Sequence, residues 1–298
     1  KDIIQELQRS YIEAGSQIIY APTFGGNRIN LKKHGLQDRI EEINRTLVGY
    51  SREVAPEGVY VAGDITTSGE FIIPDGDDED YTYDTAFQMY QEQVRILCDA
   101  GVDLIVAETM ISIDETLAAV DAVRSVCDLP IMCSVTVDAD GSIFSGGNAI
   151  EAAISLEAAG ADAIEINILA LQTDMQYNYG SFEQRHIDIL SHIKKTVRIP
   201  IIMKLGDNLT NPIALIDQLY ANGAAAVVLF NRFYQPDIDI EKMKQISGNV
   251  FSTGADLVKA LRWIGIASAA VNKLDYAASG GIHSPEGIVK SILAGASA

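Results

Sequence analysis

Residues 158–169 read AAGADAIEINIL, in which a helical stretch ends in a small residue and glycine and an apolar run follows at once. The same pattern returns as EAGSQIIYAPTF (13–24), DAGVDLIVAETM (99–110) and ANGAAAVVLFNR (221–232). Glycine at these points supplies the left-handed cap of a helix, and the uninterrupted apolar run is typical of a strand buried on both faces. The repeat therefore predicts helix–strand units of a parallel sheet.

Between these units lie further apolar runs, namely GVYVAGDIT (58–66), DLPIMCSVTV (128–137), RIPIIMKLG (198–206) and KLDYAASGG (273–281). Together the two sets predict eight strands, near 17–22, 58–64, 103–108, 130–136, 163–168, 200–205, 226–231 and 274–280. Helical patterns separate them, so the fold class is α/β, and the alternation predicts a single (β/α)8 TIM barrel over residues 1–298. An open doubly wound sheet is the alternative, although no GxGxxG follows any strand.

Two details of the barrel can be expected from this pattern. The ring should close by parallel pairing of the strand at 17–22 with the strand at 274–280, because these are its first and last strands. The opening helix at 2–14 should then cover this seam from outside, since it precedes its strand.

Charge and cysteine content limit the partners that the protein can have. The 298 residues carry 22 Lys and Arg against 41 Asp and Glu, for a net charge of −19. Nucleic acids and anionic membrane surfaces need clustered basic residues, so neither is expected as a partner. The three cysteines Cys98, Cys127 and Cys133 form no CxxC pair, which favours reduced thiols and a cytoplasmic location.

From Tyr11 to about Gly147 the chain resembles the homocysteine S-methyltransferase domain of cobalamin-dependent methionine synthases. The matching stretches are YIEAGSQIIYAPTFGGNRINLKKHGL, VYVAGDITTSGE, AGVDLIVAETM and LPIMCSVTVDADGSIFSGG. From about Glu157 it resembles a dihydroorotate dehydrogenase-like FMN barrel, through EAAGADAIEINI, TDMQYNYGSFEQRHIDIL, IPIIMKLGDNLTN, GAAAVVLFNRFYQPDIDIEKM and SGGIHSPEGIVKSILAGA.

The two resemblances together imply a chimera, engineered or recombined from two four-stranded half-barrels. Residues 1–156 would form the methyltransferase-like half and residues 157–298 the dehydrogenase-like half. The first resembles strands two to five of its family and the second strands four to seven, which restores eight strands and keeps the alternation of side-chain layers inside the barrel. A natural barrel that diverged from both families is the alternative.

The methyltransferase resemblance implies a zinc site that this sequence does not reproduce. Zinc in that family is held by a Cys after the sixth strand and a Cys-Cys pair after the eighth, and it holds homocysteine as a thiolate. Ile168 stands where the first Cys would fall, so zinc is not expected. Glu108 matches the family's substrate-contacting carboxylate, and Asp64 ends another strand, which makes both weak candidates for substrate binding. The alternative is that they are polar residues satisfied by their neighbours.

The dehydrogenase resemblance implies cofactor-binding residues for FMN. Lys204 matches the lysine that contacts the flavin ring, where a cation stabilises reduced flavin. Asn167 and Asn231 match side chains near flavin or substrate. The alternatives are a salt bridge from Lys204 to Glu108 or Glu165, and loop capping for the asparagines.

No catalytic residue can be assigned on these grounds, so it is uncertain whether the chain is an enzyme. The family's proton-abstracting Cys or Ser corresponds here to Ala170. Because a C–H proton must be removed in that reaction, its base cannot be supplied by this position.

Gly280 and Gly281 are the remaining candidate cofactor-binding residues. Barrels of this kind hold phosphate on backbone N–H groups after their last strands, so the loop SGGIHSPEG predicts a site for a small anion or flavin phosphate. The alternative is that the two glycines simply form a tight turn. The expected function is a barrel without a complete natural active site that keeps residual phosphate or FMN binding. The alternatives are an FMN-dependent oxidoreductase of the dihydroorotate dehydrogenase type and a homocysteine S-methyltransferase remnant.

Overall fold

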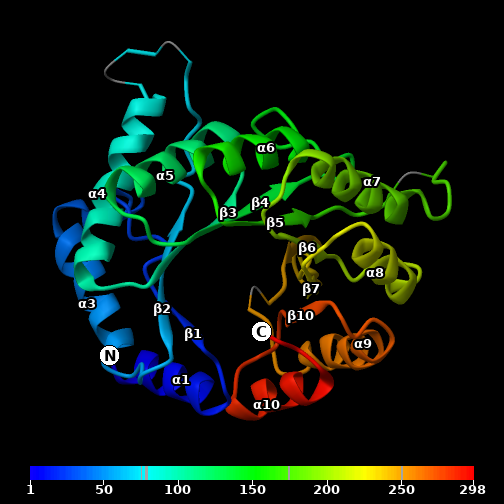
Figure 1. The fold of residues 1–298 in the computed structure, drawn as a ribbon. Helices are drawn as coiled ribbons and strands as arrows, with labels where there is room; N and C mark the ends of the chain where they lie inside the picture. Colours follow the sequence, from blue (N-terminus) through cyan, green and yellow to red (C-terminus); the bar gives the residue numbers. More distant parts are fainter. Residues whose placement is uncertain (75, 78–79, 174, 250) are drawn as a thin grey trace.

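A computed structural model describes residues 1–298 except 75, 78–79, 174 and 250. Its main feature is a curled sheet of eight parallel strands, which Figure 1 shows surrounded by helices. The strands follow one another in chain order as β1 (Ile18–Ala21), β2 (Tyr60–Thr66), β3 (Leu104–Met110), β4 (Ile131–Val137), β5 (Ala163–Ile168), β6 (Ile201–Leu205), β7 (Ala226–Leu229) and β10 (Asp275–Ala278). This confirms the α/β class and the eight predicted strands, in an arrangement consistent with a TIM-like barrel.

Helices cover the outer face of the sheet. They are α1 (Asp2–Glu13), α2 (Arg28–Lys32), the 3-10 turn η1 (Gln37–Arg39), α3 (Ile40–Arg52), α4 (Tyr83–Ala100), α5 (Ile113–Val126), α6 (Ala149–Ala159), α7 (Ser181–Thr196), α8 (Pro212–Ala221), α9 (Leu257–Ala270) and α10 (Pro285–Ala294). The core lies between the strands and this shell and includes the fully buried Val94, Leu97, Leu156 and Leu190.

The repeated glycines have the conformation that the sequence predicts. Gly101 caps α4 at φ 91° and Gly160 caps α6 at φ 104°, and Gly15 and Gly223 also have positive φ. At the other end of α6, Asn148 accepts hydrogen bonds from the backbone N–H groups of Ile150 and Glu151. Strong signals at both ends explain why this unit can be read directly from the sequence.

The predicted closure of the ring is wrong. Among the described residues β1 and β10 are not paired, and they form the two edges of the sheet. The edge of β10 is instead paired with the last residue: Ala298 N–H donates to Tyr276 O at 3.2 Å, and Ala278 N–H donates to Ala298 O at 2.9 Å. Figure 1 shows the C-terminus in this opening. Because Ala298 faces Ala277 as a parallel neighbour does, it takes hydrogen bonds that pairing with β1 would need.

Helix α1 lies against this seam, as predicted. The hydroxyl of Tyr11 donates a hydrogen bond to the carbonyl of Ile282 at 3.3 Å, which joins α1 to the loop before α10. Outside the barrel, β8 (Pro236–Asp239) and β9 (Lys244–Ser247) form an antiparallel hairpin that the sequence did not predict. In the described part of the chain, no helix is long and apolar enough to cross a membrane.

Candidate functional site

Charged side chains from several strands meet inside the curled sheet. Strands β3 and β6 are not neighbours in the sheet, yet the charge of Lys204 on β6 acts on Glu108 on β3. The charge of Glu108 in turn acts on Asp64 of β2. The first interaction crosses the inside of the curl, and the second joins the neighbouring strands β2 and β3. The group Asp64, Glu108, Glu165 and Lys204 is called the lumen cluster below.

Glu165 and Lys204 form the paired half of the lumen cluster. The Nζ of Lys204 lies 3.6 Å from Oε1 of Glu165, and the hydroxyl of Ser134 donates to the same oxygen at 2.9 Å. The side chains of Glu165 and Lys204 are 12% and 21% exposed. The predicted alternative of a salt bridge is thus confirmed for Glu165. At 3.6 Å the contact is a loose ion pair, which leaves the lysine with N–H donors for another acceptor.

Asp64 forms the unpaired half. The residue is 6% exposed, and its Oδ1 has no hydrogen-bond partner among the described atoms. Burial, and then the negative charge of Glu108, raise the pKa of Asp64 to about 8. A buried carboxyl oxygen without a partner is costly, so this arrangement favours an external cation or hydrogen-bond donor.

Glu108 lies where β3 departs from regular geometry. The register between β3 and β4 shifts between Ala107 and Met110, and Thr109 has φ 59°, a left-handed conformation that is rare for a β-branched residue. Such irregularities re-aim side chains and cluster near functional sites. Burial raises the pKa of Glu108, while Lys204 lowers it and Glu165 raises it.

A cleft reaches Glu108, one member of the lumen cluster. It has a volume of about 750 Å³ and lies at the opening between β1 and β10, where Tyr20 and Glu108 line it together with Ser279, Gly280 and Gly281. We call it the seam cleft. It exists because the ring is open, and it connects the two predicted candidates Glu108 and Gly280 to solvent.

The two predicted asparagines are in direct contact. The side-chain amide of Asn231 donates to Oδ1 of Asn167, and the amide of Asn167 reaches the hydroxyl of Thr136 at 3.5 Å. The register places Thr136, Asn167 and Lys204 in one row across β4, β5 and β6. Their roles toward a flavin stay a prediction.

The two glycines of the predicted anion site differ. The N–H of Gly281 donates to the hydroxyl of Ser252 at 3.2 Å, and a Cβ at this position would overlap the backbone of Leu257. A Cβ at Gly280 would meet nothing within 4 Å. Gly280 also lines a cavity of about 270 Å³ together with Asn231, Arg232 and Lys259, which we call the Gly280 cavity.

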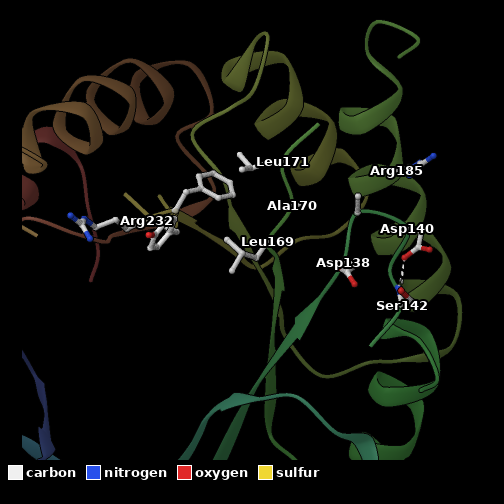
Figure 2. A pocket seen from close by; sticks show the side chains of 11 residues that line it. Asp138, Asp140, Ser142, Leu169, Ala170, Leu171, Arg185 and Arg232 are labelled. Carbon is white, nitrogen blue, oxygen red and sulfur yellow. Dashed lines mark hydrogen bonds between the residues drawn. The ribbon is translucent and has the colours of Figure 1, made fainter. Parts of the chain in front are cut away.

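A further pocket, of about 660 Å³, lies beyond the ends of β4 and β5 (Figure 2). Leu169 and Leu171 lie along its middle, while the guanidinium groups of Arg185 and Arg232 point away from it. Asp140 on its rim accepts a hydrogen bond from the hydroxyl of Ser142 at 2.6 Å. Ala170, where the resemblance places a catalytic base, contributes no titratable group here.

Sequence reasoning missed this pocket and the contributions of Ser134 and Tyr20, and it named Glu165 only as an alternative partner of Lys204. A signal for Glu165 existed, because Glu165 and Asn167 are two residues apart in AIEINI and must share one face of the strand. No comparable signal marks Ser134 or Tyr20, which come from strands far away in the sequence.

Comparison with protein families gives a match over most of the chain. The family model described as Homocysteine S-methyltransferase matches residues 1–228. The match runs past the predicted boundary at 156/157, so the chimera interpretation is not supported.

Curated relatives are much longer than this chain. Methionine synthases of Mycobacterium tuberculosis (strain ATCC 25618 / H37Rv) and Mycobacterium leprae (strain TN) are each 26% identical over 211 residues. The aligned region is 67% of this chain and 16% of either relative. The chain therefore spans about a sixth of the length of these relatives.

Solved structures share the fold. The homocysteine methyltransferase MmuM of Escherichia coli in its metallated form aligns with a TM-score of 0.58 at 14% identity, covering 97% of this chain and 83% of MmuM. Its apo form gives 0.54 at 16% identity, with 98% and 85% covered. A dihydroorotate dehydrogenase of Eimeria tenella, in complex with ferulenol, reaches only 0.47 at 15% identity over 63% of this chain and 58% of that protein, which supports no parentage.

Proposed function

Because the chain belongs to the homocysteine S-methyltransferase family, we propose that its lumen binds a zwitterionic amino acid of the homocysteine type. The observation that carries the proposal is the buried, unpartnered Oδ1 of Asp64 beside Glu108. An ammonium group supplies three N–H donors and a positive charge, so it can pair with Glu108 and stabilise the ionised form of Asp64, which releases its proton when the ligand binds. The seam cleft, which Glu108 lines, opens this side of the lumen to solvent.

The opposite side of the lumen suits the carboxylate of such a ligand. Lys204 lies across the curl from Glu108, and its contact with Glu165 is longer than a hydrogen bond. The lumen cluster therefore has a negative side on β2 and β3 and a positive group on β6. A zwitterion placed along this axis meets an opposite charge at each end, and that fixes its orientation.

The residues present do not fit the zinc ion that the family resemblance implies. In residues 1–298 without the five undescribed positions, no group of three or more His, Cys, Asp or Glu is placed to hold a metal ion. Cys133 is fully buried within β4, and the buried Ile168 occupies the position of the first expected ligand. We therefore propose binding of the amino acid and derive no methyl transfer through zinc.

Replacing Asp64 should abolish most of this binding. We expect Asp64→Asn to weaken the affinity for L-homocysteine by roughly 10- to 100-fold, because a hydrogen bond to a charged group contributes about 1.5–3 kcal/mol. Isothermal titration calorimetry measures the effect. Asp140→Asn, in the pocket of Figure 2, is the matched control and should bind like the unchanged protein.

A second ligand isolates the ammonium contact. 4-Mercaptobutanoate keeps the thiol and carboxylate of homocysteine and lacks the amine, so it should bind weakly to the unchanged protein. Equal affinity for both ligands, or no effect of Asp64→Asn, would show that the lumen carboxylates do not recognise an amine.

Residual phosphate or FMN binding is a second candidate function, favoured by one observation. Lys259 and Arg232 line the Gly280 cavity, so basic side chains face it, although Asp207 and Asp256 line it as well and balance their charge. Lys259 is paired with Asp207, which an incoming phosphate would have to displace. We therefore propose that inorganic phosphate binds there weakly and that FMN adds little.

Lys259→Gln tests this second function. In a thermal-shift titration with inorganic phosphate, the unchanged protein should gain a few degrees at high millimolar phosphate and Lys259→Gln should gain less. Lys242→Gln, on the exposed hairpin, is the control. FMN fluorescence is followed in parallel. If FMN fluorescence is quenched equally by the unchanged protein and by Lys259→Gln, the flavin binds outside the Gly280 cavity. A substitution at Gly281 is unsuitable, because it would disturb the backbone at Leu257.

A further inference from the structure

Two cysteines far from the lumen lie close enough to react with each other. The Sγ atoms of Cys98 and Cys127 are 3.3 Å apart, although the residues are 29 positions apart in the chain. Cys98 lies in the last turn of α4, and Cys127 is the residue that ends α5. Both side chains are half-buried, so a small oxidant can reach them, whereas Cys133 is fully buried.

The packing of the two helices fixes this approach. The hydroxyl of Tyr83 donates to Asp121 at 2.5 Å, and the amide of Gln91 donates to the hydroxyl of Ser125 at 2.9 Å. The two hydrogen bonds and the cysteine contact occur in the same order along α4 and α5, with the cysteine contact at the C-terminal end of both helices. Cys98 is therefore held by α4, and Cys127 directly follows the last helical residue of α5.

Little movement separates the thiol pair from a disulfide. An S–S bond is about 2.05 Å long, so the sulfur atoms must approach by about 1.3 Å. Cys127 has an extended backbone, with φ −157° and ψ 167°, beyond the helical part of α5. Its N–H donates to the carbonyl of Val123 at 2.8 Å, and this bond would have to adjust as the sulfur moves.

We propose that Cys98 and Cys127 are a redox-sensitive pair that forms a reversible disulfide between α4 and α5. The oxidant is a small-molecule disulfide. The thiolate of Cys127 attacks one of its sulfur atoms and releases one small thiol, which leaves a mixed disulfide on Cys127. The thiolate of Cys98 then attacks this sulfur and releases the second small thiol. The two protons of the protein thiols go to the released thiolates, so the protein is oxidised by two electrons and the reagent is reduced by two.

The order of attack follows from the hydrogen bond between the thiols. Cys98 donates a hydrogen bond to Cys127 across the 3.3 Å contact. Burial, and then the contact with Cys127, raise the pKa of Cys98 to about 12, and the charge of Asp99 adds to this. Because the surroundings and the whole chain are acidic, a cationic disulfide such as cystamine should react faster than the anionic oxidised glutathione.

Oxidation by cystamine tests the proposal on the full chain. The expected product has lost about 2 Da, has a single free thiol, carries no cystamine adduct and returns to the starting mass with dithiothreitol. Its melting temperature should rise by roughly 5–10 °C, because the bridge closes a loop of moderate length. Cys133→Ser should behave like the unchanged protein but end with no free thiol.

The single variants separate the outcomes. Cys98→Ser should keep a stable cystamine adduct on Cys127, which mass spectrometry detects as a gain in mass. Stable adducts on both cysteines of the unchanged protein, or a disulfide only between two molecules, would overturn the proposal. The readouts are mass and thiol count, so the result does not depend on ligand binding in the lumen.

Discussion

Glu115→Ala should lower the free energy of unfolding by about 3–5 kcal/mol, because several buried donors lose their acceptor at about 1–3 kcal/mol each. Glu115 is fully buried at the start of α5. Its carboxylate accepts hydrogen bonds from the Thr67 hydroxyl at 2.6 Å, the Ser68 N–H at 2.8 Å, the Ser68 hydroxyl at 2.6 Å and the Tyr81 hydroxyl at 2.9 Å. Alanine would leave these donors unpaired, which costs more than the contacts themselves contribute.

The position of Glu115 adds to the effect. It lies in the first turn of α5, where the helix dipole stabilises a negative charge. The donors come from the loop after β2, so the carboxylate ties this loop to the helix that follows β3. Its loss should therefore loosen the rim of the barrel next to Asp64 as well as reduce stability.

Denaturant unfolding measures this prediction. Glu115→Gln keeps one acceptor oxygen and should lose about half as much stability as Glu115→Ala. Glu57→Ala removes an exposed glutamate and should change the free energy of unfolding by less than about 0.5 kcal/mol. A Glu115→Ala protein as stable as Glu57→Ala would mean that the network contributes nothing.

Asp64→Asn should make the protein more stable than the unchanged chain at pH 8, and less so or not at all at pH 5. The pKa of Asp64 is raised to about 8 in the folded protein by burial and by Glu108, against about 3.9 in an unfolded chain. A raised pKa means that the folded state binds the proton more tightly. The stability that this proton provides is fully present below about pH 4. It decreases as the pH rises from about 4 to about 8, and above pH 8 it is lost.

The size of the effect follows from the shift. Each pKa unit corresponds to about 1.4 kcal/mol, so the stability of the unchanged protein relative to Asp64→Asn should fall by about 2–4 kcal/mol between pH 5 and pH 8. Asparagine cannot ionise and has nearly the same shape, which makes the comparison direct. Guanidinium unfolding at the two pH values measures it.

Asp140, a carboxylate whose pKa is lowered in the folded protein, serves as control. The pKa of Asp140 is lowered by hydrogen bonds from Ser142, so Asp140→Asn should not gain stability on going from pH 5 to pH 8. If Asp64→Asn and the unchanged protein had parallel pH profiles, Asp64 would not be held protonated. With L-homocysteine bound, the difference at pH 8 should shrink, because an ammonium group compensates the ionised carboxyl.

Much of the architecture could be predicted from local patterns. The eight strands were found because each is an apolar run of strand length, and four of them follow a glycine that must leave the helix with positive φ. The alternation of Glu165 and Asn167 in one strand likewise contains the information that both face the same side. The residues that make up each of these signals lie close together in the chain, so the signals can be recognised without knowledge of the fold.

The open seam could not be predicted in this way. Closure of a ring depends on which backbone groups reach the edges of β1 and β10, and Ala298 takes the hydrogen bonds on the β10 edge. The family match likewise crosses the boundary that local resemblance suggested at 156/157. The order of strands along the chain predicts which consecutive strands pair. It does not predict whether the first strand pairs with the last.

The sequence by itself determined the α/β class, the order of the strands and the placement of Asp64, Glu108, Lys204, Asn167 and Asn231 near strand ends. Only the tertiary structure decided which of these lack partners and which are paired. Lys204 meets Glu165, Asn231 meets Asn167, and Asp64 is left with a buried oxygen that has no hydrogen-bond partner among the residues that the structure describes. The reason is physical: local propensity acts over one turn or one strand, whereas burial and charge pairing depend on side chains that the curl of the sheet brings together from across the lumen.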